Sequence, residues 1–69
     1  MREFLRSPIG HRLGYIDRGS AQDVARNMDG HLLGYFIHRR NQTTDSIGQV
    51  IGFGDLLAGL IHDANKGHR

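Results

Sequence analysis

Glycine, apolar and aromatic residues recur three times along the chain in the same order. The segments SPIGHRLGY, NMDGHLLGY and DSIGQVIGF, at 7–15, 27–35 and 45–53, each place glycine fourth and eighth and an aromatic ring ninth. Large apolar residues alternate with glycine in the second half of each segment, and alternation with a period of two is typical of strands rather than helices. The pattern predicts a mainly β protein built from three hairpins.

The first four residues of each segment predict a type I turn followed by a G1 bulge. Ser, Asn or Asp stands first, where its side chain can accept a hydrogen bond from the backbone that follows, and glycine stands fourth. A loop of this kind places its glycine in the left-handed region of backbone space. We therefore expect positive φ angles at the three turn glycines, Gly10, Gly30 and Gly48.

The same loop predicts how residues pair across each hairpin. Counting back from the first turn, Leu5 is expected opposite Leu13 and Phe4 opposite Gly14, so that the Phe4 ring covers the glycine. In this register Leu13 and Tyr15 share one strand face, and Gly14 lies on the other. The equivalent residues of the other two hairpins are expected to follow the same rule.

A change of period near residue 55 marks the end of the hairpins. In GDLLAGLIHDANKG the apolar residues recur at helical spacing behind Asp55, which can cap a helix. We expect one C-terminal amphipathic helix at about 56–65. The chain is then a single domain, residues 1–69, in which three hairpins form a small sheet or a radial array with this helix. The expected hairpin units are 2–17, 22–37 and 40–55.

The length of the chain makes it a marginal domain on its own. A chain of 69 residues buries only about 60% of its unfolded surface, and without cysteine it has neither disulfides nor thiolate metal sites. Self-association is the remaining source of stability, so we expect a homo-oligomer, either a dimer or larger. The residues expected to contact another copy are Leu32, Phe36, Leu57, Leu60 and Ile61.

No membrane partner is expected from the apolar segments of the chain. The stretch MREFLRSPIG has too few apolar residues for a signal peptide, and no run approaches the ~20 apolar residues of a membrane-spanning helix. The absence of cysteine agrees with a reducing compartment. We expect a cytoplasmic protein.

The basic residues are mostly arginine, although the formal net charge is only +2. Arg6 is expected opposite Arg12, and like charges in that arrangement destabilise a sheet unless an anion or a carboxylate lies between them. Together with Arg26, and with Tyr15 and Tyr35 as stacking groups, they are candidates for binding RNA, DNA or an acidic protein. The alternative is a mixed, solvated charged surface, so nucleic acid is an allowed rather than an indicated partner.

Two further sets of residues occupy equivalent places in the hairpins. His11 and His31 follow their turns and are possible metal ligands, although exposed polar residues are the more usual occupants of that position. Glu3 and Asp23 could form an acid–base pair, but no nucleophile or oxyanion site accompanies them. We therefore expect no catalytic residue, no metal and no other cofactor.

The stretch GHLLGYFIHRRNQTTDSIGQVIGFGDLLAGLI, residues 30–61, resembles small bacterial proteins described as four-fold β-flower proteins. These contain G-x-x-[LI]-G-[YF] hairpin units and end in a G-x-G-[ND]-L-L-x-x-[LI]-I segment. The resemblance implies a radial cluster of β-hairpins with no established catalytic role. Its motifs are turns and packing residues, so they bear on fold rather than activity. Since only three units are present, the helix or a partner chain would complete a four-fold ring.

These features together predict a small non-enzymatic interaction or ligand-binding module that acts as a homo-oligomer. A nucleic-acid-binding protein with an arginine-rich face is the first alternative. A small metal- or carboxylate-dependent enzyme is the second.

Overall fold

Six strands that follow one another along the chain form a single antiparallel sheet, in the order β1-β2-β3-β4-β5-β6. The computed structural model describes residues 1–66. The strands are β1 (Arg2–Arg6), β2 (Arg12–Asp17), β3 (Gln22–Asn27), β4 (Leu32–Ile37), β5 (Gln42–Asp45) and β6 (Val50–Phe53). A short 3-10 helix, η1 (His38–Arg40), joins β4 to β5, and the helix α1 (Leu57–Lys66) follows β6. The predicted mainly β fold, with hairpins followed by one C-terminal helix, is confirmed.

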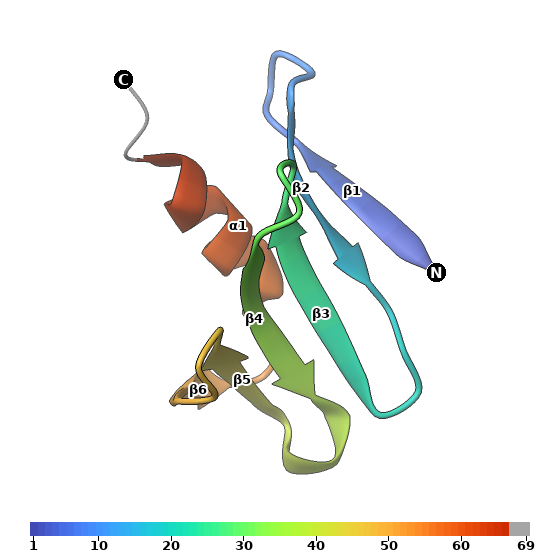
Figure 1. The fold of residues 1–69 in the computed structure, drawn as a ribbon, viewed down its shortest axis with the longest axis vertical. Coiled ribbons are helices and arrows are strands. Elements are labelled where there is room, and N and C mark those ends of the chain that lie inside the picture. The colour runs from blue at the N-terminus through green and yellow to red at the C-terminus, as the bar shows by residue number, and fades with distance from the viewer. Residues whose placement is uncertain (67–69) are drawn as a thin grey trace.

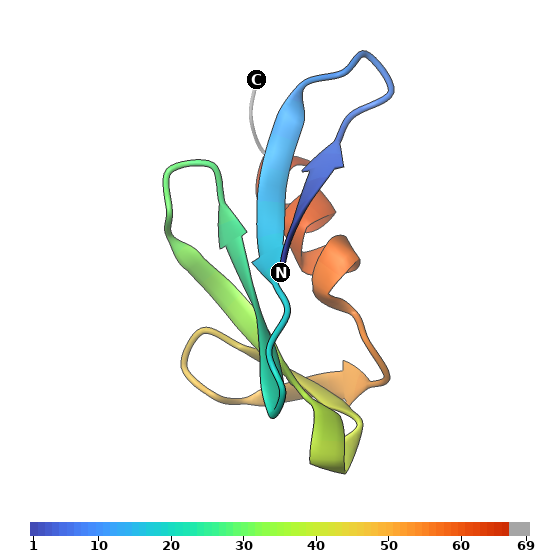
Figure 2. The ribbon, with the colours of Figure 1, turned by 90° about the vertical axis from the view of Figure 1, so that its right-hand side faces the viewer.

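The helix α1 lies against one face of the sheet, alongside β2, β3 and β4 (Figure 1). We call this the inner face and the opposite one the outer face. Within residues 1–66, β1 and β6 form the two free edges of the sheet. The strand direction turns along the sheet, so that the β5–β6 hairpin crosses the direction of β1 and β2 (Figure 2). No helix in the described part of the chain has the length and hydrophobicity needed to cross a bilayer.

The three hairpin turns have the predicted geometry. The turn glycines, Gly10, Gly30 and Gly48, have φ angles of 89°, 88° and 91°. Each glycine N–H donates to the carbonyl of the first turn residue, at 2.9, 3.0 and 3.1 Å. The side chain of that first residue, Ser7, Asn27 or Asp45, accepts the backbone N–H four positions later, at 3.2, 2.9 and 2.9 Å. These local hydrogen bonds explain why the turns can be recognised from four residues each.

A second bulge, which we did not predict, changes the register in every hairpin. Arg6 faces Arg12 as predicted. The residue before it in the chain, Leu5, was expected to face Leu13 but faces Gly14. Leu13 is thus an extra residue in β2, and the predicted pairing beyond Arg6 is wrong by one position. The equivalent extra residues in the other two hairpins are Leu33 and Ile51.

The extra residue also changes which side chains share a face, because two neighbouring residues of one strand then oppose a single partner. Leu13 packs against the core on the inner face, and Gly14 lies beneath Ile61 on the same face. Tyr15 instead faces Phe4, with 5.7 Å between the ring centroids. The predictions that Leu13 and Tyr15 share a face and that Phe4 covers Gly14 are therefore wrong.

The second glycine of each hairpin makes room for a side chain that follows β6. A Cβ atom built at Gly14, Gly34 or Gly52 would lie 3.0, 2.6 and 2.6 Å from the side chains of Ile61, Leu60 and Leu56, respectively. These distances are shorter than ordinary contacts between carbon atoms. The repeated glycine is therefore a requirement of close packing on the inner face.

Thr43 and Asp55 fix the chain between β6 and α1. The buried Thr43 hydroxyl donates to the Gly54 carbonyl at 2.6 Å and accepts the Leu56 N–H at 3.0 Å. The Asp55 carboxylate accepts the Leu57 N–H at 3.1 Å, as expected for a residue that caps the first turn. The start of α1 is therefore held by side chains from two different segments.

Candidate functional site

Three carboxylates converge on Arg18, in the loop between β2 and β3. Arg18 Nη1 lies 2.8 Å from Asp23 Oδ2 and 2.8 Å from Asp55 Oδ2, and its Nη2 lies 2.9 Å from Glu3 Oε1. His38 Nε2 lies 2.9 Å from the other oxygen of Asp23. We call these five residues the Arg18 cluster. It joins β1, β3, η1 and the segment before α1.

Asp23 is the most buried member of the Arg18 cluster, with 3% of its surface exposed. Burial alone would raise the pKa of Asp23, but hydrogen bonds from Arg18, from His38 and from the Gly19 N–H together outweigh burial and lower the pKa. The carboxylates of Glu3, Asp55 and Asp23 raise the pKa of Arg18 against the opposing effect of burial. The cluster is therefore a set of mutually stabilised charges.

The lowered pKa of Asp23 gives the stability of the protein an expected dependence on acid. A carboxylate whose pKa is lower in the folded chain stabilises the fold fully above its ordinary value of 3.8, and this contribution is lost as the pH falls through the folded pKa. In urea titrations, the free energy of unfolding should change little between about pH 7 and pH 5 and decrease below about pH 4. Asp23→Asn should show a smaller decrease than the wild type over the acid range. An equal decrease in both proteins would contradict the assignment to Asp23.

The Arg18 cluster gives Glu3 and Asp23 a structural role rather than that of an acid–base pair. Both carboxylates are bound to the same guanidinium, Asp23 through Nη1 and Glu3 through Nη2. His38 and Ser20 border a hollow of about 570 Å³ at the η1 end of the sheet. Within residues 1–66 no hydrogen bond joins the Ser20 hydroxyl to the His38 ring.

We did not predict that Arg18, Asp55 and His38 form one charged cluster, although Asp55 was predicted as the residue that caps the helix. The equivalent positions of Glu3 and Asp23 in their hairpins were a usable signal, because they predict two carboxylates in similar places. Nothing local indicates that Asp55 reaches the same arginine, since 37 positions separate it from Arg18. That contact exists only once the sheet and helix have formed.

The two histidines considered as metal ligands lie beside the turns of the first two hairpins. His11 and His31 both donate backbone N–H groups to turn side chains and are exposed. Among residues 1–66, no three His, Asp or Glu side chains are grouped so that they could hold a metal ion. These histidines are explained by their position after the turn.

Most of the arginines and rings considered for anion binding meet on the outer face of β1, β2 and β3. Arg6 faces Arg12, and the Arg12 Cζ atom lies 4.5 Å from the centroid of a neighbouring ring, that of Phe4. Tyr15 faces Arg26. The fifth predicted residue, Tyr35, is separate from them because it lies on β4, opposite Val24 on one side and Thr44 on the other.

The residues expected to contact another copy are mostly committed within the chain. Leu57 and Ile61 are fully buried, and Leu60 and Phe36 pack against the same core. Leu32 is partly buried and faces Arg26. Because α1 covers its own sheet, it does not offer its apolar side to a second copy. The exposed apolar residues lie elsewhere, mainly on and around β6.

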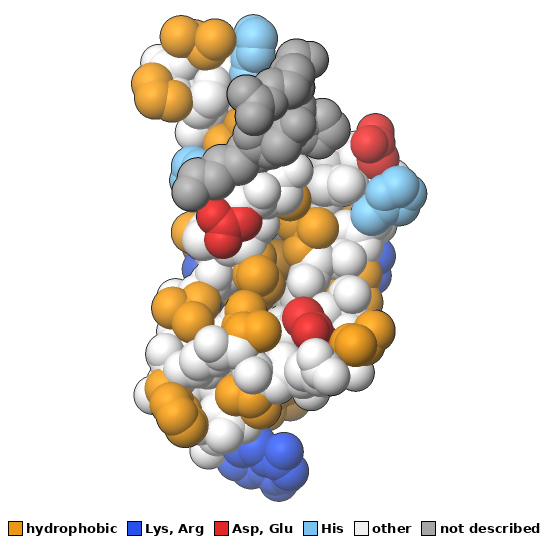
Figure 3. All heavy atoms as spheres, turned by 90° about the vertical axis from the view of Figure 1, so that its left-hand side faces the viewer, with side chains coloured by type: hydrophobic (Ala, Val, Ile, Leu, Met, Phe, Trp, Pro, Cys, Tyr) orange, Lys and Arg blue, Asp and Glu red, His pale blue; other side chains and the backbone are white. Residues whose placement is uncertain are grey.

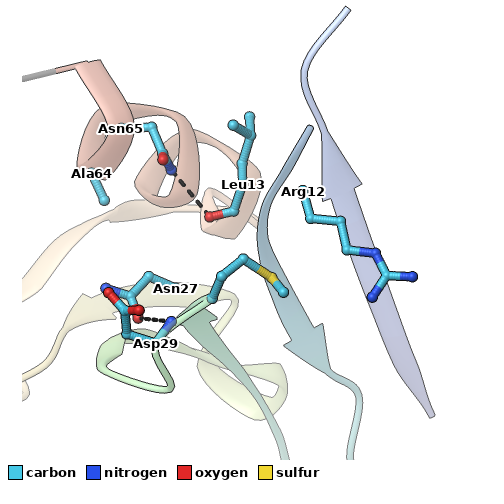
Figure 4. Close-up of a pocket in the computed structure, with 7 residues that line it drawn as sticks. Arg12, Leu13, Asn27, Asp29, Ala64 and Asn65 are labelled. Atoms are coloured by element: carbon cyan, nitrogen blue, oxygen red, sulfur yellow. Dashed lines mark hydrogen bonds between the residues drawn. The ribbon is translucent and has the colours of Figure 1, made fainter. Parts of the chain in front are cut away.

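A second hollow, of about 180 Å³, lies between the tips of the first two hairpins and the end of α1 (Figure 4). Asn65 points from α1 toward Leu13, whose carbonyl accepts the Asn65 amide at 3.1 Å. The same amide donates to the Ile61 carbonyl at 2.8 Å. Arg12 borders the hollow but extends away from it, across β1. The hollow is therefore a place where α1 is held to β2. The Arg12 side chain beside it belongs to the outer face, where it lies over Phe4.

Comparisons of the chain with protein-family models, with curated proteins and with solved structures returned no match. The resemblance to four-fold β-flower proteins stays a prediction. Any functional proposal must therefore rest on the geometry of this chain.

Proposed function

We propose that the protein is a small interaction module that acts as a homodimer and uses β6 as its contact strand. The observation that supports this most directly is the distribution of apolar surface. Among the described residues only four apolar side chains are buried, those of Ile16, Ala25, Leu57 and Ile61. Nine large hydrophobic residues are between 40% and 84% exposed. A core this small leaves a chain of this length close to the limit of independent stability.

The exposed apolar residues are concentrated around β6. Val50, Ile51 and Phe53 are 51%, 46% and 71% exposed, and Ile47 and Leu56 on either side are 77% and 40% exposed. Figure 3 shows hydrophobic side chains gathered over the lower half of the side that carries β5, β6 and the start of α1. Contiguous apolar surface of this kind is typical of a contact with another chain.

The sequence of β6 lacks the features that usually protect a free sheet edge. No charged residue stands between Asp45 and Asp55, whereas the other edge strand, β1, carries Arg2, Glu3 and Arg6. Unprotected edges pair readily with another strand. The charges on β1 oppose such pairing, so the two edges are not equivalent.

A second copy of the same chain is the partner that fits β6 best. Two uncharged β6 strands can pair antiparallel across a two-fold axis without repulsion, and each contributes the same residues to the contact. This pairing joins two six-stranded sheets into one and covers the apolar side chains of both copies. Every copy of the chain has the same small core and therefore the same need for further burial. Another copy is also the one partner that is always present wherever the protein is made.

Charged substitutions on β6 are expected to separate the dimer. Val50→Lys and Phe53→Lys should each raise the dissociation constant at least 30-fold, about 2 kcal/mol, because a lysine would be desolvated in the apolar contact. Light scattering after size exclusion at about 100 μM protein measures the mass directly. The matched control is Ile9→Lys, which changes an apolar residue that is 78% exposed at the tip of the first hairpin. A monomeric wild type, or a dimer that both β6 variants leave intact, would reject the proposal.

A further inference from the structure

Three arginines on the outer face of the sheet form no ion pair with a carboxylate among the described residues. Within residues 1–66, the arginine ion pairs are those of Arg2 with Asp17 and of Arg18 with its three carboxylates. Arg6, Arg12 and Arg26 take part in none of them, although Arg26 is half-buried, donates from Nη1 to the Gly30 carbonyl at 3.0 Å and helps to lower the pKa of Asp17. The net charge of +2 thus conceals an uneven distribution, since three of the seven acidic residues contact Arg18 while these three arginines form no ion pair.

The cross-strand pair of Arg6 and Arg12 is unfavourable for the fold by itself. The two residues face each other directly on β1 and β2, and both are exposed. Like charges in this position destabilise a sheet. No acidic side chain within the described residues relieves the repulsion through an ion pair. An anionic ligand between them would remove this cost.

Two aromatic rings continue the charged surface as a row of alternating groups. Arg12 Cζ lies 4.5 Å from the centroid of Phe4, Phe4 lies 5.7 Å from Tyr15, and Arg2 Cζ lies 4.3 Å from Tyr15. Guanidinium groups stacked on rings are held in a defined plane. Their opposite face and their N–H groups can still contact a ligand, and Arg26 lies beside Tyr15 on the next strand.

We propose that this surface, which we call the basic patch and define as Arg6, Arg12, Arg26, Phe4 and Tyr15, binds single-stranded nucleic acid. The arginines would contact phosphates, while bases would stack on the two rings and on the guanidinium planes above them. A duplex keeps its bases stacked inside and would leave the rings unused. An acidic protein would use the arginines without needing the rings. The combination of both groups on one strand face favours single strands.

The basic patch is independent of the proposed dimer contact. It lies on β1, β2 and β3, and β6 forms the opposite edge of the sheet. A nucleic acid and a second copy of the chain would therefore bind to different ends of the sheet. Loss of one interaction in a variant does not imply loss of the other.

Fluorescence anisotropy with labelled oligo(dT) and oligo(rU) of about 12 nucleotides tests the proposal. With three phosphates contacted, log K against log[salt] should have a slope of about −2 between about 50 and 200 mM salt. The double variant Arg6→Gln/Arg12→Gln should weaken binding at least about tenfold and reduce the slope by about 1.4. Tyr15→Leu should weaken binding with the slope unchanged, because it removes stacking and no charge.

The matched control is the double variant Arg39→Gln/Arg40→Gln. It removes the same charge from two exposed arginines of η1, outside the basic patch, and should leave affinity and slope unchanged. The melting temperature of Arg6→Gln/Arg12→Gln should be at least as high as that of the wild type, because the substitutions remove a repulsion between like charges. If the double variant does not fold, Arg6→Gln alone provides the same comparison.

Four results would overturn the proposal. The first is no binding of either oligonucleotide at about 50 mM salt. The second is equal weakening by the patch and control variants, which would indicate attraction by net charge alone. The third is binding of a duplex as tight as that of a single strand. The fourth is binding of polyglutamate in preference to both oligonucleotides, which would point to an acidic protein.

Discussion

Replacing Gly34 with alanine should lower the free energy of unfolding by about 3 kcal/mol, the largest effect expected from a single added methyl group in this protein. A Cβ atom at this position would collide with the Thr44 carbonyl oxygen and lie 2.6 Å from Leu60 Cδ1. Leu60 could change its rotamer, but the carbonyl belongs to the neighbouring strand, which pairs with β4 along its length. The strand cannot move away without disturbing those hydrogen bonds. Urea unfolding followed by circular dichroism measures the loss.

Alanine substitutions at two other glycines test whether the loss at Gly34 comes from the close approach of the strands or from replacing any glycine. At Gly52 the added Cβ would approach only the flexible end of Leu56, at 2.6 Å, so Gly52→Ala should cost less than about 1 kcal/mol. At Gly10 nothing lies within 4 Å, but φ is 89°, so Gly10→Ala should cost about 1 kcal/mol through backbone strain. Equal losses at Gly34 and Gly52 would show that close approach of the strands is not the reason for the glycine.

Removing the Arg18 side chain should also destabilise the protein, by about 3 kcal/mol for Arg18→Ala. The substitution leaves Asp23, which is 3% exposed, with His38 and the Gly19 N–H as its remaining partners. It also brings Asp23 and two other carboxylates together without a cation. Arg18→Lys should recover only part of the loss, because one ammonium group cannot reproduce the planar fork that meets three carboxylates. Urea unfolding near pH 7 is the measurement.

Arg2→Ala is the matched control for Arg18→Ala. Arg2 also forms an arginine–carboxylate pair, with 2.7 Å between Nε and Asp17 Oδ1, but both side chains are well exposed, at 52% and 38%. Exposed pairs of this kind contribute little to stability, so Arg2→Ala should change the unfolding midpoint only slightly. If Arg18→Ala and Arg2→Ala lowered the free energy of unfolding equally, the burial of Asp23 would not increase the contribution of the Arg18 cluster to stability.

The parts of the fold that could be predicted from the sequence depend on short segments. Each turn is determined by four residues and held by hydrogen bonds among them and with the residue that follows, so Gly10, Gly30 and Gly48 were assigned correctly. The helix could likewise be predicted, because its apolar spacing and Asp55 lie within one segment. Contacts of this range leave a clear pattern in the residue order.

The register beyond the turns could not be predicted in the same way. A bulge of one extra residue at Leu13 requires no special φ angle and no particular side chain, so it has no sequence pattern of its own. Missing it moved Gly14 to the wrong partner and led us to place Phe4 above the glycine. The bulge is favoured by the helix, because Ile61 fills the space above Gly14. That reason becomes visible only when strands and helix are seen together.

The same distinction applies to the candidate sites. The pair of Arg6 and Arg12 was predicted because it lies on the turn side of the bulge, where the register is still set by the turn. The Arg18 cluster was missed because it needs Asp55, which follows β6, to reach a loop near the start of the chain. Ion pairs between distant segments are a result of folding and cannot be read from neighbouring residues.

The position of α1 after all three hairpins has a consequence for how the protein is made. Synthesis proceeds from the N-terminus, and the sheet is built from neighbouring strands, so the hairpins can form while the chain is still growing. Within the described residues, two of the four buried apolar residues, Leu57 and Ile61, lie on α1. A ribosome-bound chain that has completed its hairpins therefore still lacks half of its core. Translation must pass residue 61 before the nascent protein becomes stable, and chains that stop earlier are natural targets for chaperones and proteases.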